Sequence, residues 1–244
     1  MHPVICRIGN FNVYSYGLML VIAFFVGASL AARQARRQGL DPDLIFNLLF
    51  IVFVSGVIGA RLFYIIYELD YYLKNPLEMI MLQHGGLAWF GSLIAGSIAG
   101  IVYLKIKKLK IMTVLDLVAP YAALGQAIGR TGCLLNGCCY GRESQFGIYF
   151  KVHNAILIPT QLYSSLALLF IFLVLRFLQE RPHPLGAVFF SYLFLYSIKR
   201  FLIEFWRSDS PSFLVGLTLF QILSIGLFCF SAAGLIFIFR KSKS

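Results

Sequence analysis

The chain has 244 residues, of which 59% are hydrophobic and only 13% are charged, and its formal net charge is +11. Soluble domains are roughly half apolar and a quarter charged, so this composition excludes an ordinary soluble domain. The basic residues lie between apolar runs, which favours charge at a membrane surface over a nucleic-acid partner. No polar linker divides the sequence, and we expect one integral-membrane domain over residues 1–244.

Apolar runs recur along the whole chain. A helix that crosses the hydrocarbon core needs about 20 apolar residues. Seven segments meet this condition: 14–32, 44–66, 86–104, 112–135, 161–178, 186–204 and 213–239. The first run has no basic region before it and no small-residue cleavage site after it, so we expect a retained span. The predicted fold is an all-α polytopic membrane protein with seven transmembrane helices. The segment GSLIAGSIAG (residues 91–100) favours close helix packing through small residues.

The basic residues predict the orientation of these spans. Twelve of them lie in alternate loops and in the C-terminal tail, at Arg33, Arg36, Arg37, Lys105, Lys107, Lys108, Lys110, Arg176, Arg181, Arg240, Lys241 and Lys243. The positive-inside rule places these on the cytoplasmic side, with the N-terminus outside and the C-terminus cytoplasmic. Seven more lie near the outer ends of spans, where the rule disfavours them: Arg61, Arg130, Arg142, Lys151, Lys199, Arg200 and Arg207. Charges at membrane depth are costly and mark functional sites, so we expect a bound anionic group there.

The segment GRTGCLLNGCCYG, residues 129–141, interrupts the apolar pattern most strongly. Its glycines permit turns and a close approach of backbone to a ligand. Arg130 offers a planar fork of donors that matches a phosphate, and Asn136 adds a neutral donor and acceptor. The alternative is a helix cap followed by a loop, with an arginine that snorkels to the membrane surface.

The segment KRFLIEFWRSD, residues 199–209, places charges inside another apolar run. Arg200 and Glu204 are four residues apart, so they share a helix face and can form an ion pair. The alternative is a salt bridge that only fixes helix packing. For Asp116, inside an earlier span, we expect a structural role, with a basic residue elsewhere as a candidate partner.

Two further segments contain candidate binding residues. Tyr16, in YSYGLM, is next to a glycine and is expected to face a cavity, although tyrosines at span ends are commonly interfacial anchors. In QHGGLAWFGS, His84 is a candidate proton acceptor near neutral pH, although a histidine beside a turn is more often a bystander. Gly85 and Gly86 are expected to form the turn into the helix.

Five cysteines, at positions 6, 133, 138, 139 and 229, form no recognisable disulfide framework. Their spacing is not typical of zinc ligands, and no base for a cysteine nucleophile is adjacent in sequence. Cys133 can bridge to Cys138 or Cys139 if these residues face an oxidising compartment. The favoured interpretation is that the three are small residues lining a cavity.

Taken together, these segments resemble the prolipoprotein diacylglyceryl transferase family. Residues 129–141 resemble its Gly-Arg…Asn-Gly…Gly signature, and GGLAWFGSLIAG resembles its Gly-Gly motif. YSYGLM, DLVAP, PTQLYSS, KRFLIEFWRSD and QILSI are similar to its other motifs and occur in the same order. The resemblance covers almost the whole chain.

The resemblance implies a monomeric enzyme of the bacterial inner membrane that transfers the diacylglyceryl group of phosphatidylglycerol to a lipobox cysteine of a prolipoprotein. It implies no cofactor, no metal and no nucleic-acid partner. By matched position, Arg130 and Arg200 hold the phosphate and Glu204 orients Arg200. The head-group site is lined by Tyr16, Asn136, Gly141, Arg207, Gly85 and Gly86.

The chain departs from the family pattern at Phe90, Cys133, Cys138 and Ser164, where relatives often have His, Asn, Glu and Glu. The base for the substrate thiol is therefore missing from its usual place. Either His84 replaces it, or the arginines lower the pKa of the thiol, or another acceptor is used. Two alternatives therefore stay open: a related phosphatidylglycerol-dependent transferase with another acceptor, and a non-enzymatic transporter or scaffold for anionic lipids.

Overall fold

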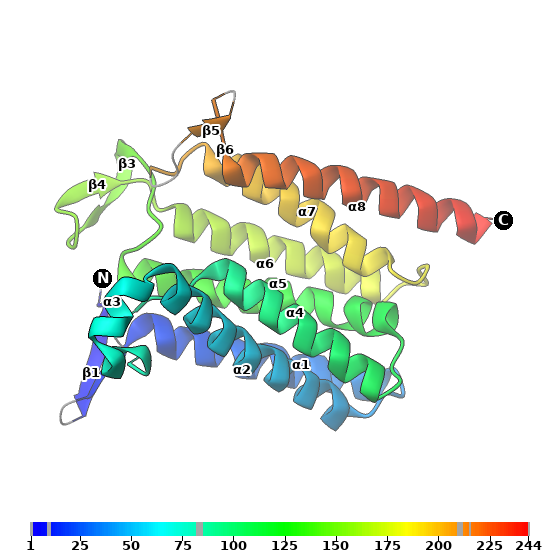
Figure 1. The fold of residues 1–244 in the computed structure, drawn as a ribbon. Helices are drawn as coiled ribbons and strands as arrows, with labels where there is room; N and C mark the ends of the chain where they lie inside the picture. The colour runs from blue at the N-terminus through cyan, green and yellow to red at the C-terminus, as the bar shows by residue number, and fades with distance from the viewer. Residues whose placement is uncertain (1, 9–10, 82–84, 209–211, 215, 244) are drawn as a thin grey trace. The chain divides into compact units, whose positions relative to one another are not determined.

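The computed structural model describes residues 2–8, 11–81, 85–208, 212–214 and 216–243, and these are mainly helical (Figure 1). The chain forms two compact units. One unit comprises residues 1–27 and 115–244, and the other comprises residues 28–114. Their boundaries fall within two long helices, α1 (Ser15–Arg37) and α5 (Ile111–Asn136).

The unit of residues 28–114 is built around two long helices that pack along one another, α2 (Pro42–Tyr67) and α4 (Trp89–Ile106). In the chain, α3 (Leu69–Lys74) and the short 3₁₀ helix η1 (Pro76–Met79) connect these two helices. Asp41 caps α2 by accepting a hydrogen bond from the amide of Asp43 at 2.9 Å, and Pro42 occupies the first turn, where its missing N–H is no loss. Gly91 of α4 lies directly against the backbone of Gly59 in α2, which confirms the close packing expected of this glycine-rich segment.

The unit of residues 1–27 and 115–244 contains the remaining helices and three short antiparallel hairpins. The hairpins were not predicted, whereas the helical class is confirmed. In chain order the unit has β1 (Val4–Ile8), β2 (Phe11–Tyr14), the first part of α1, most of α5, β3 (Glu143–Phe150), β4 (Ala155–Leu157), α6 (Thr160–Gln179), α7 (Ala187–Glu204), β5 (Ser212–Leu214), β6 (Leu217–Thr218) and α8 (Leu219–Lys243). Helix α7 packs along both α6 and α8 (Figure 1).

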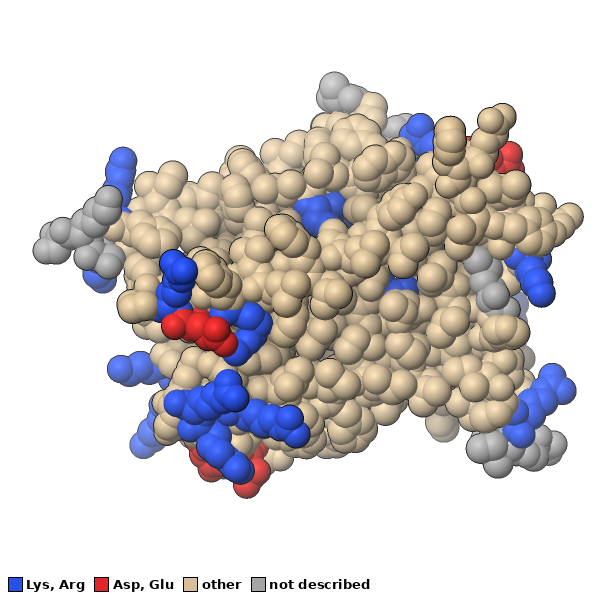
Figure 2. All heavy atoms as spheres, turned by 180° about the vertical axis from the view of Figure 1, so that it is seen from behind, with Lys and Arg blue, Asp and Glu red and all other residues tan. Residues whose placement is uncertain are grey.

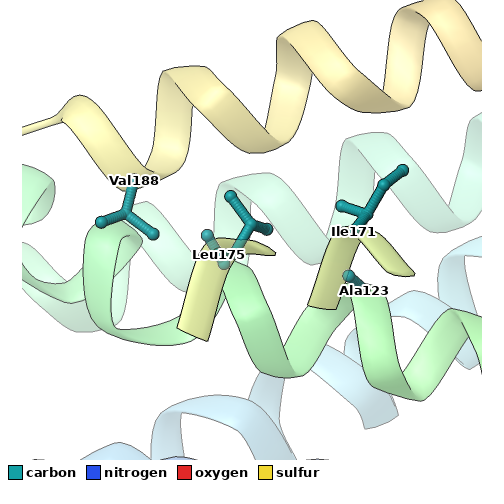
Figure 3. Close-up of a cluster of buried hydrophobic side chains, with 5 residues drawn as sticks. Ala123, Ile171, Leu175 and Val188 are labelled. Atoms are coloured by element: carbon teal, nitrogen blue, oxygen red, sulfur yellow. The ribbon is translucent and has the colours of Figure 1, made fainter. Parts of the chain in front are cut away.

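The core of this unit lies where α5, α6 and α7 meet, around Ala123, Ile171, Leu175 and Val188 (Figure 3). Asp116 of α5 fixes the start of α7, because its two carboxylate oxygens accept hydrogen bonds from the amides of Gly186 at 2.5 Å and Phe189 at 2.8 Å. A carboxylate at a helix N-terminus satisfies amides that have no partner within the helix. The expected structural role of Asp116 is confirmed, and its hydrogen-bond partners are backbone amides at the start of α7.

Within the described residues, six helices are long and apolar enough to cross a membrane: α1, α2, α4, α5, α6 and α8. Large apolar side chains point outward along them, including Phe25, Phe170 and Phe237, which are more than half exposed. Figure 2 shows a face that is mostly uncharged, with lysines and arginines in separate groups. This surface suits lipid, and the chain is a multi-pass helical membrane protein.

Candidate functional site

The signature segment, residues 129–141, ends α5 in a defined C-terminal cap. The amide of Cys138 donates to the carbonyl of Cys133 at 3.1 Å, and the amide of Gly137 donates to that of Leu134 at 3.2 Å. This pair of bonds is the Schellman motif, which requires a residue with positive φ just beyond the helix. Gly137 supplies it with a φ of 76°, and no side chain makes this conformation costly. The Asn-Gly pair in the sequence is thus a helix-ending turn.

Gly141 then brings the segment against the end of α7. Its amide donates to the carbonyl of Ile158 at 2.9 Å, and it forms a bridge with Arg207. A Cβ at this position would lie 2.6 Å from the carbonyl oxygen of Trp206 and 2.9 Å from a methyl carbon of Thr160. Real side chains do not approach backbone so closely, so only glycine fits. Gly141 therefore acts by letting Arg207 and residues 129–141 meet.

Helix α6 fixes the turn from the other side. Thr160 donates its hydroxyl to the carbonyl of Cys139, and Gln161 donates its amide to that of Cys138, each at 2.6 Å. Both donors are almost fully buried. Cys139 has a φ of 61°, which is uncommon for a residue with a Cβ and costs conformational energy. The two hydrogen bonds hold it there and explain what the Thr-Gln pair of PTQLYSS does.

Glu204 ends α7 as a completely buried carboxylate. Its Oε2 lies 2.9 Å from Nη1 of Arg200 and 3.9 Å from Nε of Arg207. Its other oxygen accepts a hydrogen bond from the hydroxyl of Thr218 at 3.0 Å. The ion pair between Arg200 and Glu204 expected from their spacing is confirmed. Sequence spacing gave no sign of Thr218, which is the last residue of β6, 14 residues further along the chain.

Four basic side chains act electrostatically on one another here, and we call Arg130, Lys199, Arg200 and Arg207 the cationic cluster. The charges of the three arginines all act on Lys199. Lys199 and Arg200 are buried, and Arg130 is half-buried. Glu204 forms ion pairs with Arg200 and Arg207. Buried charges need compensation, so the placing of the buried basic groups of Lys199 and Arg200 beside Arg130 favours an anionic ligand.

Aromatic rings give part of that compensation. The guanidinium of Arg200 lies 4.3 Å from the ring centre of Phe220, and the ammonium of Lys199 lies 4.5 Å from that of Tyr196. Each such contact stabilises a cation by about 0.5–2 kcal/mol, which is less than the cost of burying it. The sequence identifies Lys199 only as a basic residue near the outer end of a span and assigns it no binding role. The feature that could have indicated such a role is its position next to Arg200 in an apolar run.

Two other predicted binding residues lie beside the signature segment. Tyr16 lies at the start of α1, and the charge of Arg130 acts on its hydroxyl. The first turn of α1, including Met19, packs against Gly132. Asn136 is the last residue of α5, and its side chain lies near the thiol of Cys138. The structure thus brings together the predicted residues Tyr16, Arg130 and Asn136. Whether they bind a lipid head group stays a prediction.

In the other unit, Gly85 and Gly86 form a turn with φ values of 83° and 79°. Their carbonyls accept hydrogen bonds from Nη1 of Arg61 at 2.5 and 3.0 Å. Arg61 also donates to carbonyls of residues 78, 79 and 81, so its buried charge is used to shape this segment. The position of Arg61 near a span end therefore has a structural explanation. His84 lies outside the described residues, and the binding role of the two glycines stays a prediction.

A hollow of about 560 Å³ lies beside this turn. The hydroxyl of Tyr71 donates to a carboxylate oxygen of Glu78 at 3.0 Å, and this bond raises the pKa of Tyr71 above its ordinary value. Two carboxylates and several phenols form the wall, which does not suit an anion. Its lining residues are Tyr64, Glu68, Tyr71, Tyr72, Glu78, Gly85 and Gly86.

The positions that depart from the family pattern lie in different settings. Phe90 is partly exposed at the start of α4, whereas Ser164 is buried in α6. Cys133 and Cys138 lie together, and with Cys139 their sulfur atoms are all within 4.8 Å of one another. The sequence spacing did not predict this meeting of three thiols. The Schellman turn produces it by folding residues 138 and 139 back onto the end of α5.

The fold and the site define a class: a polytopic helical membrane protein with buried basic side chains in its helices. Comparison with known proteins agrees. The family model described as prolipoprotein diacylglyceryl transferase matches residues 3–238. The chain therefore belongs to the prolipoprotein diacylglyceryl transferase family.

Its curated relatives are similar over nearly their full length. The protein of Clostridium tetani is 31% identical over 243 residues, covering 95% of this chain and 97% of its own. That of Bacillus cytotoxicus is 36% identical, covering 99% and 92%, and that of Staphylococcus aureus strain MSSA476 is 34% identical, covering 99% and 90%. Each is named phosphatidylglycerol–prolipoprotein diacylglyceryl transferase.

Proposed function

We propose that this chain transfers the diacylglyceryl group of phosphatidylglycerol to the lipobox cysteine of a prolipoprotein, as the names of its relatives state for those proteins. The observation that supports this most directly is the placing of the buried basic side chains of Lys199 and Arg200 beside Arg130. A phosphodiester head group supplies one negative charge and acceptor oxygens for arginine forks.

In the proposed reaction, the sulfur of the substrate cysteine attacks the glyceride carbon that carries the phosphate. The C–S bond forms as the C–O bond breaks, the thiol proton is released, and glycerol phosphate leaves with the bonding electron pair. Arg130 and Arg200 stabilise the charge that develops on the leaving phosphate, and Glu204 keeps Arg200 in position. The arginines also favour attack by the substrate as a thiolate. His84 remains the alternative base.

We further propose that the enzyme is a monomer with one functional domain over residues 1–244. Helix α7 is its seventh span, because it packs along the apolar helices α6 and α8 although it contains Lys199, Arg200 and Glu204. With the N-terminus outside and the C-terminus cytoplasmic, twelve basic residues lie on the cytoplasmic side of the inner membrane. The cationic cluster then faces the outer leaflet.

The test uses purified protein in micelles, phosphatidylglycerol labelled in its acyl chains, and a lipobox peptide. Labelled peptide is expected, and its formation should fall steeply for Arg130→Gln and Arg200→Gln. Arg240→Gln removes an exposed arginine at the end of α8 and should leave the rate unchanged. A peptide with Ser for Cys should accept no label. Lipid binding without product, or product only with a cysteine-free acceptor, contradicts the proposal.

A further inference from the structure

The proposed transfer reaction gives no role to the three thiols that meet beyond the end of α5. We call Cys133, Cys138 and Cys139 the thiol cluster. Cys133 is buried, whereas Cys138 and Cys139 are half-buried, so the cluster is reachable from one side. Their three sulfur atoms lie within 4.8 Å of one another, and each offers one ligand atom.

This arrangement is close to that of a metal–thiolate centre. Metal–sulfur bonds of about 2.3 Å hold three sulfur atoms about 4 Å apart when they surround one ion. The sulfur atoms of the thiol cluster need to move by only a fraction of an ångström to reach that spacing. Thiolates are soft ligands that select Cu(I) and Zn(II) over harder ions.

The backbone holds the thiols in place without a metal. The Schellman bonds fix Cys138 against Cys133, and Thr160 and Gln161 hold the carbonyls of Cys139 and Cys138 at 2.6 Å. The turn itself is also held by a hydrogen bond between a ring nitrogen of His153 and the carbonyl oxygen of Gly137, at 2.8 Å. A site held in this way loses little conformational freedom when an ion binds. The uncommon φ of Cys139 is the cost of turning a third sulfur toward the other two.

The charges nearby also fit a metal–thiolate complex. Three thiolates around one Cu(I) or Zn(II) have a net negative charge, and the charges of Arg130 and Arg207 act on Cys139. The positive charges of these arginines offset the negative charge of such a complex. As the ion binds, each thiol forms one metal–sulfur bond and releases one proton to solvent.

We propose that the thiol cluster is a binding site for a thiophilic metal ion, with Cu(I) as the ion that fits best. Zinc in proteins almost always has four ligands, whereas three thiolates complete the coordination of Cu(I). This inference does not depend on the proposed transferase activity, because its test measures binding alone.

The experiment uses the full chain in micelles, reduced and desalted without oxygen. Cu(I) is supplied as its complex with a coloured chelator, and its transfer to the protein is followed by the loss of colour. One ion per chain is expected. Replacing the two exposed cysteines, as Cys6→Ser with Cys229→Ser, should leave this number unchanged. The triple replacement Cys133→Ser, Cys138→Ser and Cys139→Ser should abolish it.

A second measurement needs no variant and so does not depend on how well one folds. The parent protein is treated with a maleimide with and without Cu(I), and the labelled peptides are identified by mass spectrometry. Cu(I) should protect Cys133, Cys138 and Cys139 but leave Cys6 and Cys229 labelled. Absence of stoichiometric binding, equal binding by the triple variant, or equal labelling of all five thiols overturns the site. Binding of Zn(II) without Cu(I) overturns the choice of ion.

Discussion

Replacing Glu204 by glutamine tests two effects of its ion pair with Arg200: the stability of the fold and the rate of transfer. The substitution keeps the size of the side chain and leaves an oxygen for the hydroxyl of Thr218, which donates to Glu204 at 3.0 Å. It removes the negative charge 2.9 Å from Arg200 and turns an amide donor toward the guanidinium. The side chain of Glu204 is fully buried and that of Arg200 is 10% exposed, so water cannot replace the lost partner.

Removing one partner of a buried ion pair costs about 3–5 kcal/mol, and the excess of positive charge here places the expected loss at the upper part of that range. Phosphatidylglycerol should recover some of it, because its phosphate supplies a negative charge. A ligand at 100 times its Kd stabilises a protein by about 2.7 kcal/mol, and this shift should be larger in Glu204→Gln than in the parent. The transfer rate should still fall, because Arg200 is no longer held in place.

Unfolding in micelles is followed by tryptophan fluorescence with and without phosphatidylglycerol, and the rate is followed with labelled lipid. Thr218→Val is the matched control, since it removes one hydrogen bond to the carboxylate, worth about 1.5–3 kcal/mol, and keeps the ion pair. Combining Glu204→Gln with Arg200→Gln should cost less than the sum of the two. Parent-like stability of Glu204→Gln, or strict additivity of the pair, would refute the electrostatic reasoning.

Three other substitutions test single contacts. Gly141→Ala should lower stability by about 1–3 kcal/mol and slow transfer, because its Cβ would overlap the backbone at the end of α7; Gly129→Ala, in open space, should do neither. Asp116→Ala should cost about 1–2 kcal/mol in unfolding experiments, since two amides of α7 lose their acceptor, and an unchanged midpoint would contradict the capping role. Arg61→Gln should make the backbone at residues 78–81 and 85–86 more sensitive to protease without weakening phosphatidylglycerol binding, and the reverse result would make Arg61 an anion ligand.

Helix positions could be predicted from the sequence because length and apolarity are local properties. Each of the seven predicted spans corresponds to a helix, and six have the composition of a membrane span. The pairing of Arg200 with Glu204 was predictable for the same reason, because residues four apart on a helix lie next to each other on one face. The three short hairpins were not predicted, because strands of two to eight residues have little periodicity to detect.

Contacts between distant residues could not be predicted in the same way. The partners of Arg61 lie 17 to 25 residues away along the chain, and no pattern in that interval indicates carbonyls that converge on a guanidinium. The thiol cluster is different, because its cause is local. Gly137 one residue beyond a helix is a known signal of the Schellman turn, and that turn brings residues 133 and 138 together. The helix-ending signal at Gly137 therefore predicts that the thiols meet, whereas the spacings typical of metal ligands do not.

The arrangement around Glu204 also explains why so much positive charge is placed inside a membrane protein. An arginine in water binds phosphate weakly, because both groups are well solvated and the arginine must be oriented. Here burial, the ion pair with Glu204 and the ring of Phe220 hold Arg200 in one orientation before a ligand arrives. The energy for this comes from folding, through contacts such as the Asp116 cap that fix α7 at its other end. In the proposed reaction, an entering phosphate would meet donors already oriented, and the charge that develops on it during C–O cleavage would be stabilised without further rearrangement.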